Sequence, residues 1–225
     1  DIAGGWLDQP YVSKYFPGPV ITTSIHPTVD FNERSGMASS TRAKALDMWG
    51  PRLPAGNSEK LARILFCYDN PPGKAYISGS QDSIGIVFPG INLMHYDGDY
   101  WPEKIESCHD ESAIQMVERS LYLLPLGPRG HEYDVLSQTR IDRAGAEALA
   151  KAAISCWGAI QRCDLMAFGQ AFRESFEAQI AMFPLMFTPQ VGEMIDQFRG
   201  KVLGWKLSGA GGGGYLILVS NRPVE

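Results

Sequence analysis

Two short segments of this sequence have the composition of anion-binding loops. The first, residues 208–214, reads Ser-Gly-Ala-Gly-Gly-Gly-Gly, and an apolar, β-prone run follows it. Glycine has no Cβ, so several backbone N–H groups can crowd around one guest, and phosphate oxygens are the usual guest of such a nest. A flexible turn entering a hairpin has the same composition, and this segment alone leaves both interpretations open.

The second segment is small and polar and precedes a run of helix formers at 42–49. It contains Gly36 followed by the consecutive hydroxyl residues Ser39, Ser40 and Thr41. At a helix start, free N–H groups, hydroxyls and the positive end of the helix dipole can all face one anion. The alternative is an N-terminal cap made of small residues. Caps rarely need three consecutive hydroxyls, so anion binding stays open here too.

A third candidate is Asp8, which lies in a glycine- and proline-rich turn beside Trp6 and Tyr11. A carboxylate next to an aromatic face suits a sugar, because the hydroxyls donate to the acid while the C–H face stacks on the ring. The alternative is a capped turn with Trp6 in the core. On these residues alone the second interpretation is favoured.

Strands and helices must bring these segments together. The composition predicts strands at 19–25, 91–96 and 120–126, with a hairpin turn at 97–99. Apolar spacing predicts helices at 42–49, 58–68, 144–163, 167–181 and 189–198, whereas 84–88 is too short to assign. The aromatic stripe of 167–181 is expected to be core rather than a ligand site.

Strands and glycine turns are expected to dominate the first hundred residues, and helices the last hundred. This distribution predicts an α+β protein with two lobes, 1–100 and 101–225. The sequence has no internal repeat.

The overall composition describes an ordinary globular protein. The chain has 225 residues, of which 44% are hydrophobic and 20% charged, and its formal net charge is −5. The negative charge argues against a nucleic-acid partner, and no apolar run reaches the roughly 18 residues that would span a membrane. The four cysteines form no C-x-x-C pair, so buried reduced thiols in a cytoplasmic protein are expected rather than a zinc site. The oligomeric state is left open.

Four segments, taken in order, resemble the motifs of the GHMP kinase superfamily, which includes galactokinase, homoserine kinase and mevalonate kinase. Residues 1–10 are similar to the first motif of its sugar-kinase branch, which contains heptose kinases and the kinase part of L-fucokinase. Residues 35–41 resemble the phosphate loop, 79–82 resemble a G-x-Q-D segment, and 208–214 match the C-terminal glycine motif. Each motif is weak alone, but their order covers nearly the whole chain.

The resemblance implies an ATP- and Mg²⁺-dependent kinase that phosphorylates a hydroxyl of a sugar or sugar phosphate. It also implies a two-lobed GHMP-kinase-like fold with a helix-rich C-terminal lobe. Asp82 would be the catalytic carboxylate, which orients or deprotonates the attacking hydroxyl. The implied substrate-binding residues are Asp8, Trp6, Gln81, Gly211 and Gly212. The implied nucleotide-binding residues are Gly36, Ala38, Ser39, Ser40, Thr41 and Gly209. Ser40 and Asp69 would hold Mg²⁺.

The sequence departs from the family pattern in two places. Only about ten residues separate the strand ending at Ile25 from the phosphate loop, so a reduced N-terminal lobe is expected. Ala38 stands where the family usually has glycine. Two alternatives therefore stay open: a non-catalytic protein that binds a sugar or nucleotide, and one module of a longer enzyme of nucleotide-sugar synthesis.

Overall fold

The computed structural model describes residues 1–25, 37–130 and 132–224. In chain order its elements are α1 (Pro10–Ser13), β1 (Gly18–Thr23), α2 (Ser39–Trp49), α3 (Ser58–Asp69), α4 (Ser80–Val87), β2 (Ile91–Tyr96), β3 (Lys104–Cys108), α5 (Glu111–Ser120), β4 (Leu121–Gly127), α6 (Arg143–Gln161), α7 (Leu165–Met182), the 3₁₀ turn η1 (Pro184–Met186), α8 (Pro189–Phe198), β5 (Gly204–Leu207) and β6 (Gly214–Val219). Among these elements, no helix is long and apolar enough to cross a membrane.

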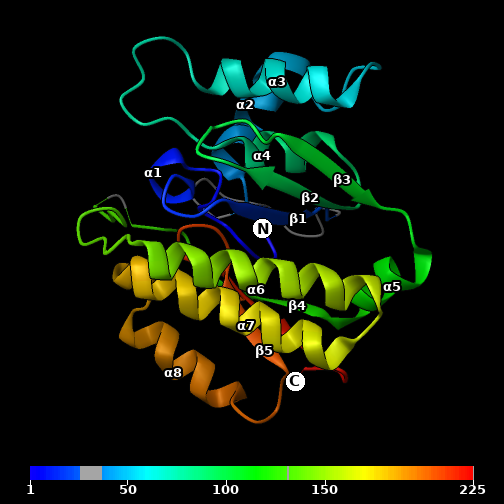
Figure 1. The fold of residues 1–225 in the computed structure, drawn as a ribbon, viewed down its shortest axis with the longest axis vertical. Helices are drawn as coiled ribbons and strands as arrows, with labels where there is room; N and C mark the ends of the chain where they lie inside the picture. The colour runs from blue at the N-terminus through cyan, green and yellow to red at the C-terminus, as the bar shows by residue number, and fades with distance from the viewer. Residues whose placement is uncertain (26–36, 131, 225) are drawn as a thin grey trace.

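The first sheet is antiparallel and has the order β1-β2-β3. Figure 1 shows it between α4 above and α6 below, with α2 and α3 stacked over α4. The first motif joins this sheet, because the N–H of Ile2 donates to the carbonyl of Ile21 at 2.7 Å and the N–H of Ile21 donates to Ala3 at 2.9 Å. The N-terminal segment therefore lies at the centre of the molecule rather than on its surface.

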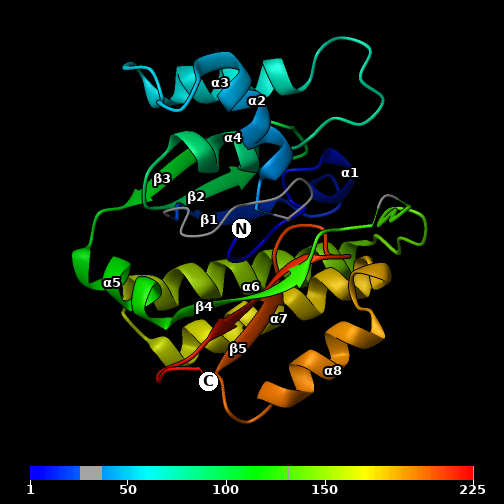
Figure 2. The same cartoon turned by 180° about the vertical axis from the view of Figure 1, so that it is seen from behind.

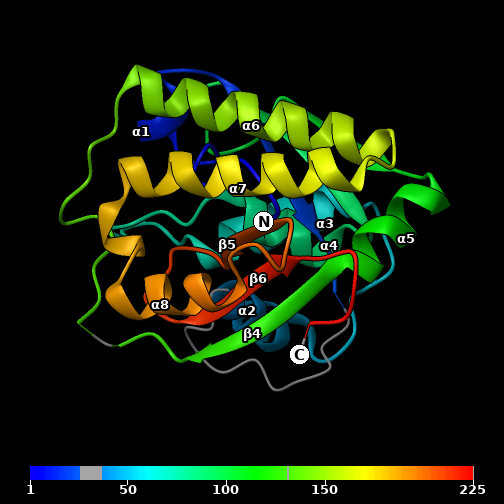
Figure 3. The same ribbon diagram turned by 90° about the horizontal axis from the view of Figure 1, so that it is seen from below.

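The second sheet has the order β4-β6-β5 and is also antiparallel. Every residue of the central strand β6 is buried, as expected for an apolar run with neighbours on both edges. Helix α7 packs on β5, and α8 covers the outer end of this half (Figure 2). Figure 3 shows α6 and α7 running side by side along the molecule.

The two long helices begin at aspartate caps and bury the stripes that their spacing predicts. Asp142 accepts the N–H of Gly145 at 2.7 Å, and Asp164 accepts the N–H of Ala167 at 3.0 Å, so free N–H groups of the first turns are paired. The buried residues of the two stripes include Leu149, Ala153, Cys156, Ile160, Phe168, Phe172 and Phe176. These side chains form core, as expected from the sequence.

The α+β class is confirmed, but the expected distribution of elements is wrong in the first hundred residues. Four helices lie there, and one of them, α4, includes most of the segment left unassigned at 84–88. Helix α4 has only eight residues and buries residues on several of its faces. Its apolar residues therefore do not recur with a clear 3.6-residue period. Strand β3 and helix α5 were not predicted. All four cysteines are free as expected, but Cys67 and Cys163 are exposed rather than buried.

Candidate functional site

The first motif is a rigid turn held by helix α7. The N–H of Gly4 donates to Ser175 Oγ at 3.0 Å, and Gln179 Nε2 donates to the carbonyl of Gly5 at 3.0 Å. Trp6 follows with φ of 85°, a conformation that L-residues rarely adopt, and its ring stacks on Phe183 with centroids 4.2 Å apart. Strain of this kind persists only where the surroundings fix the backbone. The turn therefore gives Asp8 a fixed position.

Asp8 lies at the N-terminus of α4, far from it in sequence. Its side chain is buried, and the carboxylate accepts the backbone N–H of Gln81. A carboxylate is stabilised there by the free N–H groups and the positive end of the helix dipole. Any Cβ at Gly79 would overlap the Asp8 carboxylate. This contact is the physical reason for glycine at the start of the Gly-Ser-Gln-Asp segment.

Asp82 lies in the first turn of the same helix and is half-buried. Burial, with a smaller contribution from Asp82, raises the pKa of Asp8 to about 7. Burial also raises the pKa of Asp82, and the charge of Asp69 contributes to this increase. Asp82 thus interacts electrostatically with both Asp8 and Asp69, although the three residues come from separate segments. A carboxyl group with a raised pKa is suited to accepting a proton near neutral pH.

Gln81 places its side-chain oxygen in the same region. Gln81 Oε1 is buried and has no hydrogen-bond partner among the described residues. Buried polar oxygens are normally paired, so this oxygen is available to accept a hydrogen bond from a ligand.

The phosphate-loop segment leads into α2, and its helix packs against the end of α3. Thr41 is buried, and its Oγ1 donates to Asp69 Oδ2 at 2.7 Å. Ser39 is half-buried and Ser40 is exposed. Of the two residues expected to bind the metal, Ser40 and Asp69, only Ser40 is therefore exposed. Gly36 lies outside the described residues.

Ala38 is the residue before α2 and adopts a left-handed conformation, with φ of 54° and ψ of 29°. This region favours glycine, because a Cβ crowds the backbone there. The glycine that the resemblance implies at this position would adopt this conformation freely, whereas Ala38 adopts it at a cost.

The glycine motif is a loop whose glycines adopt backbone angles that other residues rarely adopt. Gly209, Gly211, Gly212, Gly213 and Gly214 all have φ between 60° and 150°. A Cβ on Gly212 would lie 2.6 Å from the Tyr133 ring, and one on Gly213 would lie 2.6 Å from the backbone nitrogen of Arg129. The glycines are thus required by close contact with the segment that follows β4, as well as by their own backbone angles.

Arg129 and Tyr133 bind the carbonyl groups of this loop. Arg129 Nε donates to the carbonyl of Gly211 at 2.7 Å, and the Tyr133 hydroxyl donates to that of Ala210 at 2.8 Å. The Arg129 guanidinium lies over the Tyr133 ring, 5.5 Å from its centroid, and its charge partly offsets the rise that burial causes in the pKa of Asp82. Arg129 therefore connects the glycine motif to the acid at the start of α4.

Sequence reasoning missed Arg129 and also a buried ion pair. The only signal for Arg129 was its place in a Gly-Pro-Arg-Gly loop directly after a strand. Lys206 on β5 is fully buried, and its Nζ lies 2.6 Å from Asp1 Oδ1. Burial lowers the pKa of Lys206 to about 7. A single lysine in an apolar run gave no indication of its partner 205 positions earlier.

No family model matches this sequence. The chain is 40% identical over 65 residues to the L-fucokinase/L-fucose-1-P guanylyltransferase of Bacteroides fragilis, a match that covers 29% of this chain and 7% of that protein. The structure is similar to that of a Campylobacter jejuni protein described as a sugar kinase, with a TM-score of 0.58 and 18% identity over 85% of this chain and 55% of that one.

Two further solved structures are similar. For a D-glycero-D-manno-heptose 1-phosphate kinase of Bacteroides thetaiotaomicron the TM-score is 0.56, with 13% identity over 97% of this chain and 85% of that one. For a mevalonate kinase the TM-score is also 0.56, with 17% identity over 82% of this chain and 56% of that one.

The neighbours are GHMP-type kinases, and the chain has their fold. The expected resemblance to this superfamily is thus confirmed at the level of the fold, and a 65-residue segment is similar in sequence to the fucokinase protein. The chain spans about half the length of the sugar kinase and mevalonate kinase structures, and a small fraction of the fucokinase protein.

Proposed function

We propose that this protein transfers the γ-phosphoryl group of ATP to a hydroxyl of a sugar or sugar phosphate. The observation that carries the proposal is the position of Asp82. It lies half-buried in the first turn of α4, and its pKa is raised by burial and by the charge of Asp69. In a fold shared with sugar and mevalonate kinases, such a carboxyl group is suited to orienting the attacking hydroxyl and accepting its proton.

The acceptor would lie between the first motif and the start of α4. Asp8 and the unpaired oxygen of Gln81 would accept hydrogen bonds from sugar hydroxyls. The exposed part of Trp6, whose backbone is fixed in a strained conformation, would contact the C–H face of the sugar. Gly211 and Gly212 would line the pocket, and the charge of Arg129 would partly offset the rise in the pKa of Asp82.

The nucleotide would bind at the start of α2. The helix N-terminus after Ala38 and the hydroxyls of Ser39 and Ser40 would face its phosphates, with Gly36 and Gly209 as further contacts. The Thr41 hydroxyl already donates to Asp69 and would instead hold that acid in place. We assign the ATP-binding lobe to residues 1–100 and the lobe with the glycine motif to 101–225.

Asp69 and Ser40 would hold a magnesium ion. Their donors fit it in type, because Mg²⁺ takes oxygen ligands and usually needs only one or two carboxylates besides phosphates and water. Asp69 is 6% exposed and is already hydrogen-bonded to Thr41, which fixes the carboxylate in one orientation. When bound, the ion would neutralise the charge of the phosphates during transfer.

The relatives leave the acceptor open between a free sugar and a sugar phosphate. The fucokinase match favours the first and the heptose 1-phosphate kinase structure favours the second. All four cysteines are free, which is typical of a reducing compartment, and we infer a cytoplasmic location. A non-catalytic sugar-binding protein is the second candidate, since Ala38 adopts a conformation that favours glycine beside the expected phosphate site.

A screen of free sugars and sugar phosphates with Mg-ATP, read as ADP release, tests the proposal. With the best acceptor, Asp82→Asn is expected to lower turnover by about two or more orders of magnitude, because it removes the positioned base. Asp97→Asn in the exposed hairpin turn is the matched control and should retain full turnover. Acceptor binding without any ADP release would favour the non-catalytic alternative, and full activity in Asp82→Asn would remove this residue from the mechanism.

A further inference from the structure

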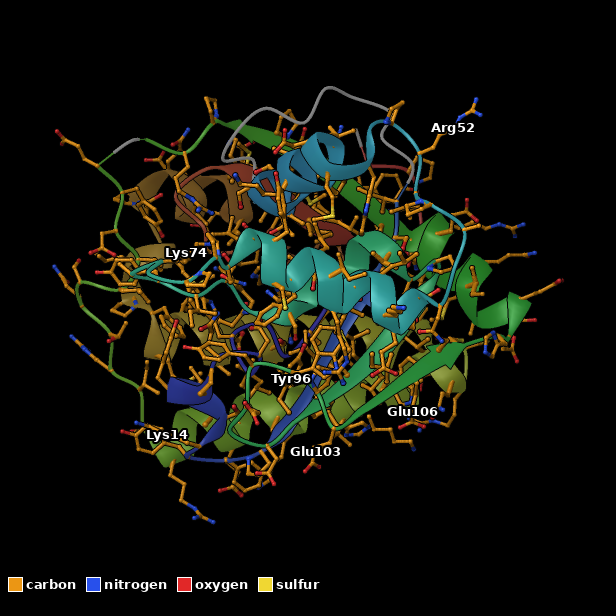
Figure 4. All side chains as sticks on the ribbon, turned by 90° about the horizontal axis from the view of Figure 1, so that it is seen from above. Lys14, Arg52, Lys74, Tyr96, Glu103 and Glu106 are labelled. Atoms are coloured by element: carbon orange, nitrogen blue, oxygen red, sulfur yellow. The ribbon has the colours of Figure 1, made fainter. Side chains whose placement is uncertain are left out.

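Lys74 places a positive charge beside the acid expected to bind the metal. It lies in the loop between α3 and α4 and is labelled in Figure 4. Its Nζ donates to the backbone carbonyl of Asp69 at 2.6 Å and lies 3.5 Å from Asp69 Oδ1. It also donates to Asn70 Oδ1 at 3.1 Å and to Ser78 Oγ at 3.0 Å. Four oxygens thus surround one ammonium group.

Both carboxylate oxygens of Asp69 are therefore engaged. The Thr41 hydroxyl donates to Oδ2 at 2.7 Å, and the ammonium group of Lys74 lies 3.5 Å from Oδ1. A magnesium ion lies only about 2.1 Å from a ligating oxygen. An ion at Oδ1 would then lie within a few ångströms of Nζ, where two positive charges repel strongly in a partly buried site.

The surrounding loop does not depend on Lys74 alone. Asn70 Nδ2 donates to the carbonyl of Ser78 at 3.1 Å, and the N–H of Ser78 donates to Asn70 Oδ1 at 2.8 Å. This pair closes the loop independently. Lys74 is also about one-third exposed, so its long side chain can turn toward solvent without disrupting the core.

We propose that Lys74 is a tethered cation that competes with a divalent metal ion for Asp69, and that metal binding displaces its ammonium group from the carboxylate. The inference rests on the proposed function, which supplies the reason for a metal ion at Asp69. In the absence of nucleotide, Lys74 keeps the buried carboxylate neutralised and metal binding weak. The phosphates of bound ATP offer the displaced ammonium group a new partner.

Direct titration with Mn²⁺, followed by water-proton relaxation without nucleotide or sugar, tests this competition. Lys74→Met removes the charge, whereas Lys74→Gln removes the charge but keeps a donor for Asn70 and Ser78. Both are expected to bind Mn²⁺ about tenfold more tightly than the unaltered protein, and the gain should shrink at high salt. Lys60→Met, at an exposed position in the first turn of α3, is the control and should leave Mn²⁺ affinity unchanged.

The gain in Mn²⁺ affinity of the Lys74 variants must also depend on Asp69. Combining either Lys74 variant with Asp69→Asn should abolish it. Unchanged or weaker Mn²⁺ binding in both Lys74 variants would overturn the proposal, as would a gain that persists without Asp69 or an absence of Mn²⁺ binding in every variant. Because the titration involves neither sugar nor turnover, its failure is distinguishable from failure of the kinase assay. A structural role of Lys74 alone would lower the thermal stability of Lys74→Met without changing its Mn²⁺ affinity.

Discussion

At the scale of single residues, the candidate site is defined by acids whose surroundings change their chemistry. The sequence indicates the residue types: Asp8 beside aromatic side chains, Asp82 after Gln81, and hydroxyls before a helix. It does not indicate their partners, because the bond from Gln81 to Asp8 and the contact of Lys74 with Asp69 depend on how the chain folds back. Arg129 was missed for the same reason, since a loop arginine acquires its role only through the loop it binds.

The raised pKa of Asp8 gives a prediction for the pH dependence of stability. Its carboxyl group has a pKa of about 7 in the folded protein and near 4 in the unfolded chain, so the folded state binds the proton more tightly. This contribution to stability is fully present below about pH 4 and is lost as the pH rises toward 7. It amounts to at most about 4 kcal/mol.

In the Asp8→Asn variant, the loss of stability that Asp8 causes as the pH rises should disappear. Urea unfolding between pH 4 and 7 measures it: the unaltered protein should lose stability relative to the variant as the pH rises. Parallel curves for the two proteins would show that Asp8 titrates normally in the folded state.

At the scale of elements, helix α4 connects the first motif to Asp82, the proposed catalytic acid. Sequence reasoning recognised the Gly-Ser-Gln-Asp segment but not that it begins a helix, because an eight-residue helix with several buried sides lacks a clear period. The longer helices α6 and α7 were predictable, since their apolar spacing is sustained over about five turns. The geometry at the start of α4 is therefore a property of the contact between two segments rather than of either one.

The contact between Gly79 and Asp8 leads to a prediction for α4. Gly79→Ala should destabilise the protein by about 1–3 kcal/mol and lower kinase turnover, because the new methyl group must displace the Asp8 carboxylate. Gly130→Ala is the matched control, since nothing lies within 4 Å of a Cβ built there. Thermal unfolding and ADP release measure both effects. Equal stability and turnover in the two variants would show that Asp8 does not occupy the α4 N-terminus.

At the scale of the whole molecule, contacts between distant segments hold the two sheets and the site together. Ser175 and Gln179 on α7 hold the first motif, and the Lys206–Asp1 pair joins that motif to the strand before the glycine loop. The α+β class was predictable from composition and motif order. The central position of the N-terminal segment was not, because it depends on hydrogen bonds to β1 and α7 that span up to 174 positions.

The buried Lys206–Asp1 pair can be tested by a double-mutant cycle. Lys206→Met should destabilise the fold by about 3–5 kcal/mol, because it leaves a buried carboxylate without its counter-charge. Adding Asp1→Asn should recover part of this loss, since neither buried charge then remains. Denaturant unfolding of the four proteins measures the coupling, and strictly additive effects would show that the pair does not interact.

The central claim is that these segments form one site that moves a phosphoryl group from ATP to a sugar hydroxyl. ³¹P NMR of the protein with Mg-ATP and its best acceptor tests this most directly. We expect a new phosphate-ester resonance that grows as ADP forms and that is nearly absent with Asp82→Asn. A signal of inorganic phosphate alone, or an ester that forms equally well without the Asp82 carboxylate, would contradict it.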